Sequence, residues 1–305
     1  MQRYVNIVLG SVLTLLAVSL LTFVLMKLVP GGPFDGDKVL PPEVMAALNK
    51  KFKLDLPWWA QYLDYMRGLF VFDLGPSIKY PGRSVNEIVT ESFPISFELG
   101  FYSLLLSIGL GLSLGIVAAV YRGTIWDYSA MILAVSGVSL PSFMVAAIGI
   151  LFFSHTLGIL PAALWDSPAH KILPTIVLGL RPAAIIARFT RSSLLEVLSL
   201  DYVRTAKAKG LSQKKVIVVH ALRNSLLPVL TILGPLAASI LTGSFIVEHV
   251  FSVPGLATHY IQGVSNRDYP LVMGVTLLFA VVLVGMNLLV DFCYGWLDPR
   301  MKDLT

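Results

Sequence analysis

The chain has 305 residues, of which 56% are hydrophobic and only 13% are charged. Soluble domains carry about 25% charged residues, so this composition indicates an integral membrane protein. The net charge is +5. In a membrane protein, clusters of Lys and Arg are first interpreted as signals of membrane topology and not as nucleic-acid binding sites. A single cysteine, Cys293, excludes an intrachain disulfide and a multi-cysteine metal site.

The first predicted element is a transmembrane helix at residues 1–29. An apolar stretch from Ile7 to Val29 is interrupted only by Lys27. It is longer than the h-region of a signal peptide, which has about 7–15 residues, and no A-x-A cleavage pattern ends it. We therefore expect the helix to be retained.

Residues 30–94 form the next segment, which we expect to lie on the external side of the membrane. Its pattern predicts two short amphipathic helices, with Pro42 and Pro57 in first-turn positions. We expect a small cap folded onto the membrane helices and not an independent domain.

Five more apolar stretches approach or exceed the roughly 20 residues that a span needs. We place them in a core of residues 95–298, followed by a cytoplasmic tail at 299–305. The predicted fold is therefore all-α, a polytopic membrane protein with six transmembrane helices. The stretches are Ile95–Val120, Tyr128–Leu157, Ile172–Ala187, Leu226–Val250 and Leu271–Trp296.

The Lys and Arg residues of the short loops predict the orientation. With the N-terminus inside, the inner segments hold 12 of them and the two short outer loops hold only Lys171 and Arg267. Because inner loops are enriched in Lys and Arg, an N-in/C-in topology follows. Residues 30–94 are left out of this count, since long loops translocate largely regardless of charge.

Irregular backbone and charge inside the spans mark a possible substrate path. The third stretch can break at Pro141-Ser142 and the fifth at Gly234-Pro235, and such breaks are tolerated where they line a cavity. Arg181 falls near the middle of the short fourth stretch. It either faces a pore, where it could contact a substrate carboxylate, or forms a structural ion pair. Three acids nearer the ends of spans are expected at the membrane interface: Glu98, Glu248 and Asp291.

Small residues predict close helix packing in the second stretch. Gly111 and Gly115 form a G-x-x-x-G pattern there, and this spacing lets helix backbones approach each other in lipid.

A basic loop at residues 188–225 is the most informative feature. Leu195, Leu198, Tyr202 and Ala206 step by three or four and predict one helix face, and Gly210 is placed to end that helix. A second short helix is expected over Lys215–Ala221. The loop is either a docking element for a cytoplasmic partner or a solvated loop without one. Its cations are Arg204, Lys207, Lys209, Lys214, Lys215 and Arg223.

The same residues resemble the cytoplasmic coupling motif of binding-protein-dependent ABC importer permeases. The family pattern is E-A-A, three residues, G, nine residues, then I-x-L-P. Arg204-Thr205-Ala206 stands in the E-A-A place, followed by Lys207, and Gly210 stands in the glycine place. His220 and Leu222 stand where Ile and Leu are usual, and Arg223 replaces the proline.

Other stretches resemble the B-type permease subunit of oligopeptide and dipeptide importers, so that the likeness covers essentially the whole chain. Two early pieces, LPPEV and GPSIKY, are more similar to the oligopeptide systems. Dipeptides, murein peptides, glutathione-like peptides and nickel chelates remain alternative substrates. The stretches are LVPGGPF, LPPEV, FDLGPSIKY, SFPIS, VSLPSF, FSVPGL, NRDYPLV and LDPR.

The resemblance implies a type I ABC importer permease in the bacterial inner membrane. It would pair with a homologous C-type permease, two cytoplasmic ATPases and an extracytoplasmic peptide-binding protein. Thr205, Ala206 and Gly210 would give a small-residue docking surface, while Arg204 and Lys207 could pair with acids of the ATPase. The chain lacks the G-x-x-x-x-G-K-[ST] phosphate loop. ATP and Mg²⁺ would therefore be bound by the ATPases, and we expect no cofactor, metal or catalytic residue in this chain.

Two other classes of protein fit the sequence less well. An intramembrane zinc protease needs H-E-x-x-H, and the five histidines do not form that pattern. Secondary transporters often carry internal repeats and intramembrane ion-coupling acids. No repeat is visible here, and a dedicated basic loop fits a channel or secondary transporter poorly.

Overall fold

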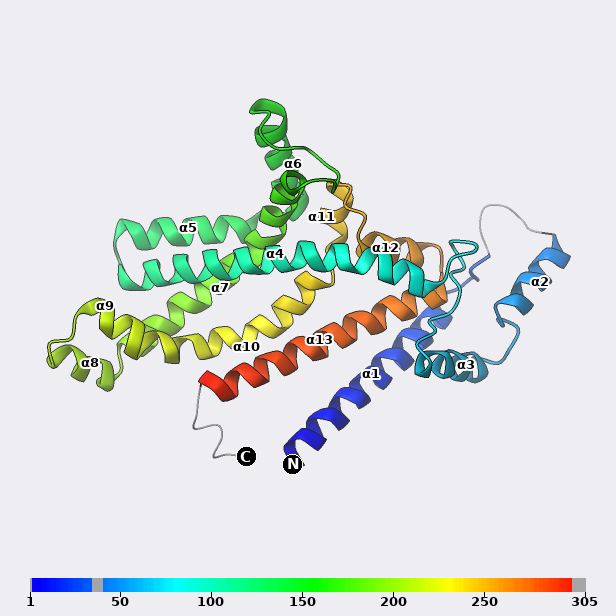
Figure 1. Cartoon of the computed structure of the whole chain (residues 1–305), viewed down its shortest axis with the longest axis horizontal. Coiled ribbons are helices and arrows are strands. Elements are labelled where there is room, and N and C mark those ends of the chain that lie inside the picture. Colours follow the sequence, from blue (N-terminus) through cyan, green and yellow to red (C-terminus); the bar gives the residue numbers. More distant parts are fainter. Residues whose placement is uncertain (1, 35–40, 298–305) are drawn as a thin grey trace. The chain divides into compact units, whose positions relative to one another are not determined.

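The computed structural model describes residues 2–34 and 41–297, and within them every regular element is a helix (Figure 1). In this described part the β pairing is limited to an isolated bridge between Pro76 and Ser84. The all-α prediction is confirmed. The predicted tail at 299–305 lies outside the described residues. The helices form two compact units, Met1–Ile95 with Gly255–Val282 (unit 1) and Ser96–Pro254 with Leu283–Thr305 (unit 2).

Among the described residues, five helical stretches are long and apolar enough to cross a membrane, and a bent pair can supply a sixth. The pair consists of Ile125–Ser139 and Ser142–Thr156, which meet at an angle of 107°. The expected break at Pro141 is therefore present. The elements are α1 Gln2–Leu28, α2 Pro42–Lys51, α3 Trp58–Phe70, α4 Val85–Val120, α5 Ile125–Ser139, α6 Ser142–Gly149, η1 Ile150–Thr156, α7 Pro168–Leu198, α8 Asp201–Ala208, α9 Gln213–Lys215, η2 Val216–Ala221, α10 Leu222–Leu241, α11 Phe245–Val250, α12 Leu256–Ser265 and α13 Tyr269–Leu297.

Two spans are longer than their apolar stretches. Helix α4 begins at Val85 and continues through Pro94, and α7 runs unbroken through Pro174 and Pro182. Proline is tolerated inside membrane helices because neighbouring groups satisfy the freed carbonyls. Beyond its apolar part, α7 is extended by an amphipathic stretch whose buried face includes Leu194.

Helices α4 and α7 pack through the predicted glycines in unit 2. A Cβ atom at Gly111 would lie 2.6 Å from Cβ of Ile186, and one at Gly115 would lie 2.6 Å from the carbonyl oxygen of Ala187. The close packing predicted from G-x-x-x-G is thus confirmed. Ser113 lies between these glycines. The letters G-x-S-x-G fall here within a continuous helix and not on the strand-to-helix turn of a hydrolase nucleophile.

Unit 1 joins the first part of α4 to α12 and α13. Val85 and Ile88 of α4 form a buried cluster with Leu256 of α12 and Leu271 of α13. Pro42 begins α2 and Pro57 directly precedes α3.

Helix α3 is attached to α1 in the same unit. The hydroxyls of Ser19 and Tyr62 lie 2.8 Å apart, and Lys27 Nζ donates a hydrogen bond to Gln61 Oε1 at 2.6 Å. The segment between the first two spans therefore packs on the membrane helices of its own unit.

Candidate functional site

The basic loop folds as a short helix held between two long ones. Helix α7 ends at Leu198, α8 covers Asp201–Ala208, and the chain then returns through α9 and η2 into α10. The single helix predicted across Leu195 and Ala206 is wrong. The Ser199 hydroxyl donates to the Glu196 carbonyl at 2.7 Å, and Leu200 is extended. Such side-chain bonds compete with continuation of a helix, so the chain changes direction there.

An apolar cluster fixes α8 to the long helices. Val203 and Ala206, on one face of α8, pack against Leu194 of α7 and Val216 of η2, and Ala119 of α4 joins the same cluster. Val203 and Val216 are fully buried. Because the interior is closely packed, a displacement of α8 must be passed on to α7 and to η2.

The opposite face of α8 is polar and open. Arg204, Thr205 and Lys207 are exposed. Arg204 contacts Asp201 at 3.5 Å, an exposed i,i+3 pair of the kind that contributes little to stability. The part of this loop predicted to be cationic and outward is therefore outward in the structure.

One predicted docking residue is placed elsewhere. Ala206 is buried in the cluster and presents no surface to a partner, because α8 uses this side to attach to α7 and η2. The expectation that Ala206 belongs to a small-residue docking surface is wrong. His220 and Leu222 are half-buried, and the His220 carbonyl accepts a hydrogen bond from the Tyr202 hydroxyl at 3.2 Å.

Gly210 ends the turn after α8 as predicted. Its φ is +78°, in the left-handed region that favours glycine. The amide of Gly210 donates to the Lys207 carbonyl at 3.0 Å, and a Cβ atom there would meet nothing within 4 Å. The glycine is required by the backbone angle and not by crowding within this chain.

The second short helix is continuous with α10. Residues 213–221 form α9 and the π-helix η2, and α10 follows without a break, so the helix begins well before the predicted apolar stretch Leu226–Val250. Ser212 caps this stretch, its Oγ accepting from the Lys215 amide at 3.4 Å. A π-helix inside a longer helix is rare and frequent at functional sites. Here it leaves Val218 and Val219 exposed beside the basic residues.

A cavity of about 580 Å³ in unit 2 joins three of the five predicted substrate-path residues. Pro141 and Ser142, at the break between α5 and α6, and Arg181 of α7 line it. Gly234 and Pro235 of α10 do not. Gly234 is buried against α13, where a Cβ atom would lie 2.7 Å from Asn287 Oδ1. The α10 residues on the cavity wall lie further along the helix, at Leu236, Ser239 and Ile240.

The acids near the span ends differ from one another. Glu248 is completely buried, and the Ser96 hydroxyl donates to its Oε1 at 2.8 Å, so the predicted interfacial exposure is wrong for this residue. It is buried because α11 folds back beside the start of the unit 2 part of α4. Glu98 forms an ion pair with Lys171 at 2.5 Å, and Asp291 is exposed.

Two polar contacts were not anticipated from the sequence. In unit 2 the Asp127 carboxylate, nearly buried on α5, accepts from Nε and Nη2 of Arg191 at 2.7 and 2.8 Å. In unit 1 the Ser77 hydroxyl and the Lys79 amide donate to the buried Asp268 carboxylate at 2.5 and 2.9 Å. In both contacts the acid and its donors are far apart in sequence, so no spacing pattern could predict that they meet.

The segment at residues 72–84 makes further polar contacts with α12. The Tyr80 hydroxyl donates to Gln262 Oε1 and lies 3.1 Å from Nδ1 of His259. Burial lowers the pKa of His259, and nearby Arg83 lowers it further, while Glu91 acts in the opposite direction. The bond from Ser77 to Asp268 brings the motifs FDLGPSIKY and NRDYPLV into contact.

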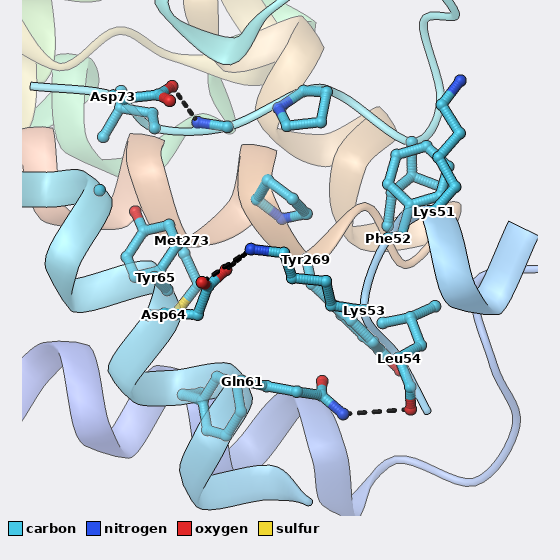
Figure 2. Close-up of a pocket in the computed structure, with 17 residues that line it drawn as sticks. Lys51, Phe52, Lys53, Leu54, Gln61, Asp64, Tyr65, Asp73, Tyr269 and Met273 are labelled. Atoms are coloured by element: carbon cyan, nitrogen blue, oxygen red, sulfur yellow. Dashed lines mark hydrogen bonds and ion pairs between the residues drawn. The ribbon is translucent and has the colours of Figure 1, made fainter. Parts of the chain in front are cut away.

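A second cavity, of about 250 Å³, lies within unit 1 (Figure 2). Lys53 Nζ lies 2.7 Å from both oxygens of Asp64, and Gln61 Nε2 donates to the Leu54 carbonyl at 3.1 Å (Figure 2). Burial raises the pKa of Tyr65, whose hydroxyl has no hydrogen-bond partner among the described residues. These bonds close the turn between α2 and α3, and we assign the cavity no ligand.

Comparison with known proteins decides the family. Residues 111–303 match the profile described as "Binding-protein-dependent transport system inner membrane component". Residues 1–99 match the profile of its N-terminal part, "Binding-prot-dependent transport system membrane comp, N-term". The chain belongs to this family. The resemblance inferred from the coupling loop is confirmed, and the chain is a multi-pass inner-membrane permease.

Relatives and solved structures agree with this placement. The dipeptide transport system permease protein DppB of Bacillus subtilis (strain 168) is 50% identical over 289 residues, covering 95% of this chain and 94% of that protein. The oligopeptide transport system permease protein OppB of Escherichia coli (strain K12) is 42% identical over 296 residues, covering 96% and 97%. A chain of the inward-facing MetNI methionine ABC transporter matches with a TM-score of 0.56 at 18% identity. This match covers 69% of our chain and 96% of that chain, and it supports the permease fold.

Proposed function

We propose that this chain forms half of the pore of an ATP-driven peptide importer and is coupled through α8 to ATPases on the cytoplasmic side. The observation that carries the proposal is the construction of α8. One face is sealed into a cluster shared with α4, α7 and η2, while the other presents Arg204, Thr205 and Lys207 to solvent.

This construction suits the transmission of force. A partner that grips the polar face of α8 moves α7 and η2 with it, because the cluster leaves no space for α8 to shift alone. Helix α7 carries Arg181 and η2 leads into α10, and both helices line the 580 Å³ cavity. Closure of the ATPases would in this way change the shape of the cavity.

The proposed assembly contains this chain, a homologous C-type permease, two ATPase subunits that bind ATP and Mg²⁺, and an extracytoplasmic binding protein. We place the N- and C-termini inside, with residues 30–94 as an external cap and 188–225 as the cytoplasmic coupling loop. Names of relatives support a peptide cargo, since they include both dipeptide and oligopeptide permeases. Within that class we propose oligopeptides, on the LPPEV and GPSIKY stretches.

Affinity purification from the native membrane followed by reconstitution tests the assembly. We expect a second permease and ATPase subunits to co-purify, and the complex with its binding protein to take up peptides only when ATP is supplied. The double variant Arg204→Glu/Lys207→Glu should lose most of this uptake, because the exposed cations of α8 would repel acids that they now attract. Lys50→Glu reverses an exposed cation on α2 and should leave uptake unchanged.

A channel or secondary transporter would behave differently. This chain, purified alone and reconstituted, would then carry solute without ATPase subunits, and the α8 variant would transport as well as the wild type. Either result would overturn the coupling proposal.

A further inference from the structure

The cavity at the α5–α6 break has one charged group on its wall. Of the described residues that line it, Arg181 alone carries a charge, and the remainder are glycine, proline, serine and aliphatic residues. The wall is contributed by the end of α5, the start of α6, the middle of α7 and the end of α10.

The guanidinium of Arg181 is not used within the described chain. The residue is exposed, and no hydrogen bond or ion pair joins its side chain to another described residue. The other arginine of α7 near a helix contact, Arg191, is by contrast held by both oxygens of Asp127. An arginine stays charged at every accessible pH and offers a planar fork of donors that matches a carboxylate. An unpaired arginine within a membrane span is a functional hypothesis by default.

Backbone groups freed by the two prolines surround the same space. Pro182 lacks an N–H group, so the carbonyl of Leu178, also on the wall, loses its donor in the α7 ladder. At the break, α5 ends at Ser139 and α6 begins at Ser142. The Pro141 carbonyl accepts from the Met144 and Val145 amides at 3.0 and 3.2 Å, while the first amides of α6 and the last carbonyls of α5 have no partners within their helices.

Serine hydroxyls add to this polar lining. Ser139 and Ser239 donate to carbonyls of their own helices at 2.9 and 2.8 Å, which leaves their oxygens as acceptors. The hydroxyls of Ser142 and Ser244 make no hydrogen bond within the described part of the chain.

We infer that this cavity holds the C-terminal end of a peptide in transit, with Arg181 binding its free carboxylate. The unpaired backbone groups and hydroxyls would meet the peptide's main chain, which is the same in every sequence. The small and aliphatic wall would leave side chains without specific contacts, so many sequences could pass. This inference rests on the proposed peptide-importer function.

Uptake of two matched peptides tests it. The reconstituted complex, with its binding protein, is given one peptide with a free C-terminal carboxylate and the same peptide with a C-terminal amide. Arg181→Gln should lower uptake of the free-carboxylate peptide on the order of tenfold, as expected for the loss of a charged hydrogen bond. Uptake of the amidated peptide, relative to wild type, should change much less, and Arg181→Lys should restore part of the loss.

Arg67→Gln is the control, since Arg67 is an exposed arginine on α3, outside the coupling loop, and does not line the cavity. An equal loss for both peptides would overturn the inference and assign Arg181 to an ion pair with the second permease or a lipid phosphate. Unchanged uptake of both would overturn it as well. A wild-type complex that imports no peptide would instead refute the proposed function.

A photoreactive residue at the peptide's C-terminus gives a second readout. It tests whether the C-terminus lies in this cavity even if the wild-type complex does not carry the amidated peptide. Labelling should fall on residues 137–145 or 177–185 and decrease in Arg181→Gln. Labelling confined to other parts of the pore would overturn the inference.

Discussion

Helix α8 and the segment at residues 72–84 are both short elements docked on longer helices, but they are held by opposite means. Helix α8 is fixed by apolar side chains such as Val203, and its polar groups face outward. The segment 72–84 is fixed by polar groups. Its Ser77 hydroxyl and Lys79 amide donate hydrogen bonds to the fully buried carboxylate of Asp268.

This difference separates an element built to meet a partner from one built to stay in place. Buried polar networks are demanding in geometry and specify one arrangement, which suits a fixed part of the fold. An apolar attachment leaves charged side chains free for a second protein, which suits a coupling element. Four substitutions test the contrast, from the largest expected effect to the smallest.

Asp268→Ala should be the most damaging change to the fold. It removes the acceptor of the Ser77 hydroxyl and of the Lys79 and Leu271 amides, and it leaves the Ser77 and Leu271 donors buried. A loss of about 3 kcal/mol in the free energy of unfolding is expected. The midpoint of chemical denaturation in detergent measures it. Asp55→Ala, at an exposed acid of the α2–α3 turn, should have little effect; a similar loss in both would remove the special role of Asp268.

Ala206→Leu should disturb α8 from within. The added atoms have no room in the cluster around Val203 and Leu194, and overpacking of this kind costs about 1–3 kcal/mol. Stimulation of ATP hydrolysis by loaded binding protein should fall with it. Ala47→Leu places the same side chain on an exposed position of α2, outside the coupling loop, and should change neither quantity. Normal coupling in Ala206→Leu would contradict the apolar attachment.

Gly210→Ala should strain the turn after α8 and leave the rest of the fold intact. A non-glycine residue at φ +78° costs about 1–2 kcal/mol, while Gly210→Asn should cost less because asparagine tolerates this region. Thermal unfolding and coupled ATPase activity are the readouts. Gly109→Ala, in the middle of α4 where a Cβ atom meets nothing within 4 Å, should not destabilise.

Mild acid should loosen the segment 72–84 through His259. Its pKa is lowered in the fold, chiefly by burial, so below about pH 6.5 the unfolded chain binds a proton that the folded chain does not. Stability should therefore fall as the pH drops below 6.5. His259→Gln should remove this part of the pH dependence, measured as the unfolding midpoint at pH 7.5 and 5.5. His155→Gln, at an exposed histidine, should retain it.

Local features of the fold could be predicted because their causes are local. The spans follow from apolar length, the break at Pro141 from the missing N–H group, the turn at Gly210 from its backbone freedom, and the contact at Gly111 from its small size. The family itself could be inferred from the spacing of Arg204 and Gly210.

Features that depend on tertiary contacts could not be predicted. Whether Ala206 faces a partner or its own core is decided by where α8 lies on α7 and η2. The burial of Glu248 depends on a contact with Ser96, far away in the sequence. The Gly234-Pro235 pair predicts irregular backbone on a substrate path, but the position of Gly234 opposite Asn287 makes it a packing residue.

Cross-linking between α8 and an ATPase subunit tests the central claim most directly. In a Cys293→Ser background, Thr205→Cys places a thiol on the exposed face of α8, and Ala46→Cys places one on the exposed surface of α2. A reagent that joins thiols to lysines should yield a product containing an ATPase subunit with Thr205→Cys and none with Ala46→Cys. A complex that hydrolyses ATP normally but gives no such product from Thr205→Cys would contradict the account.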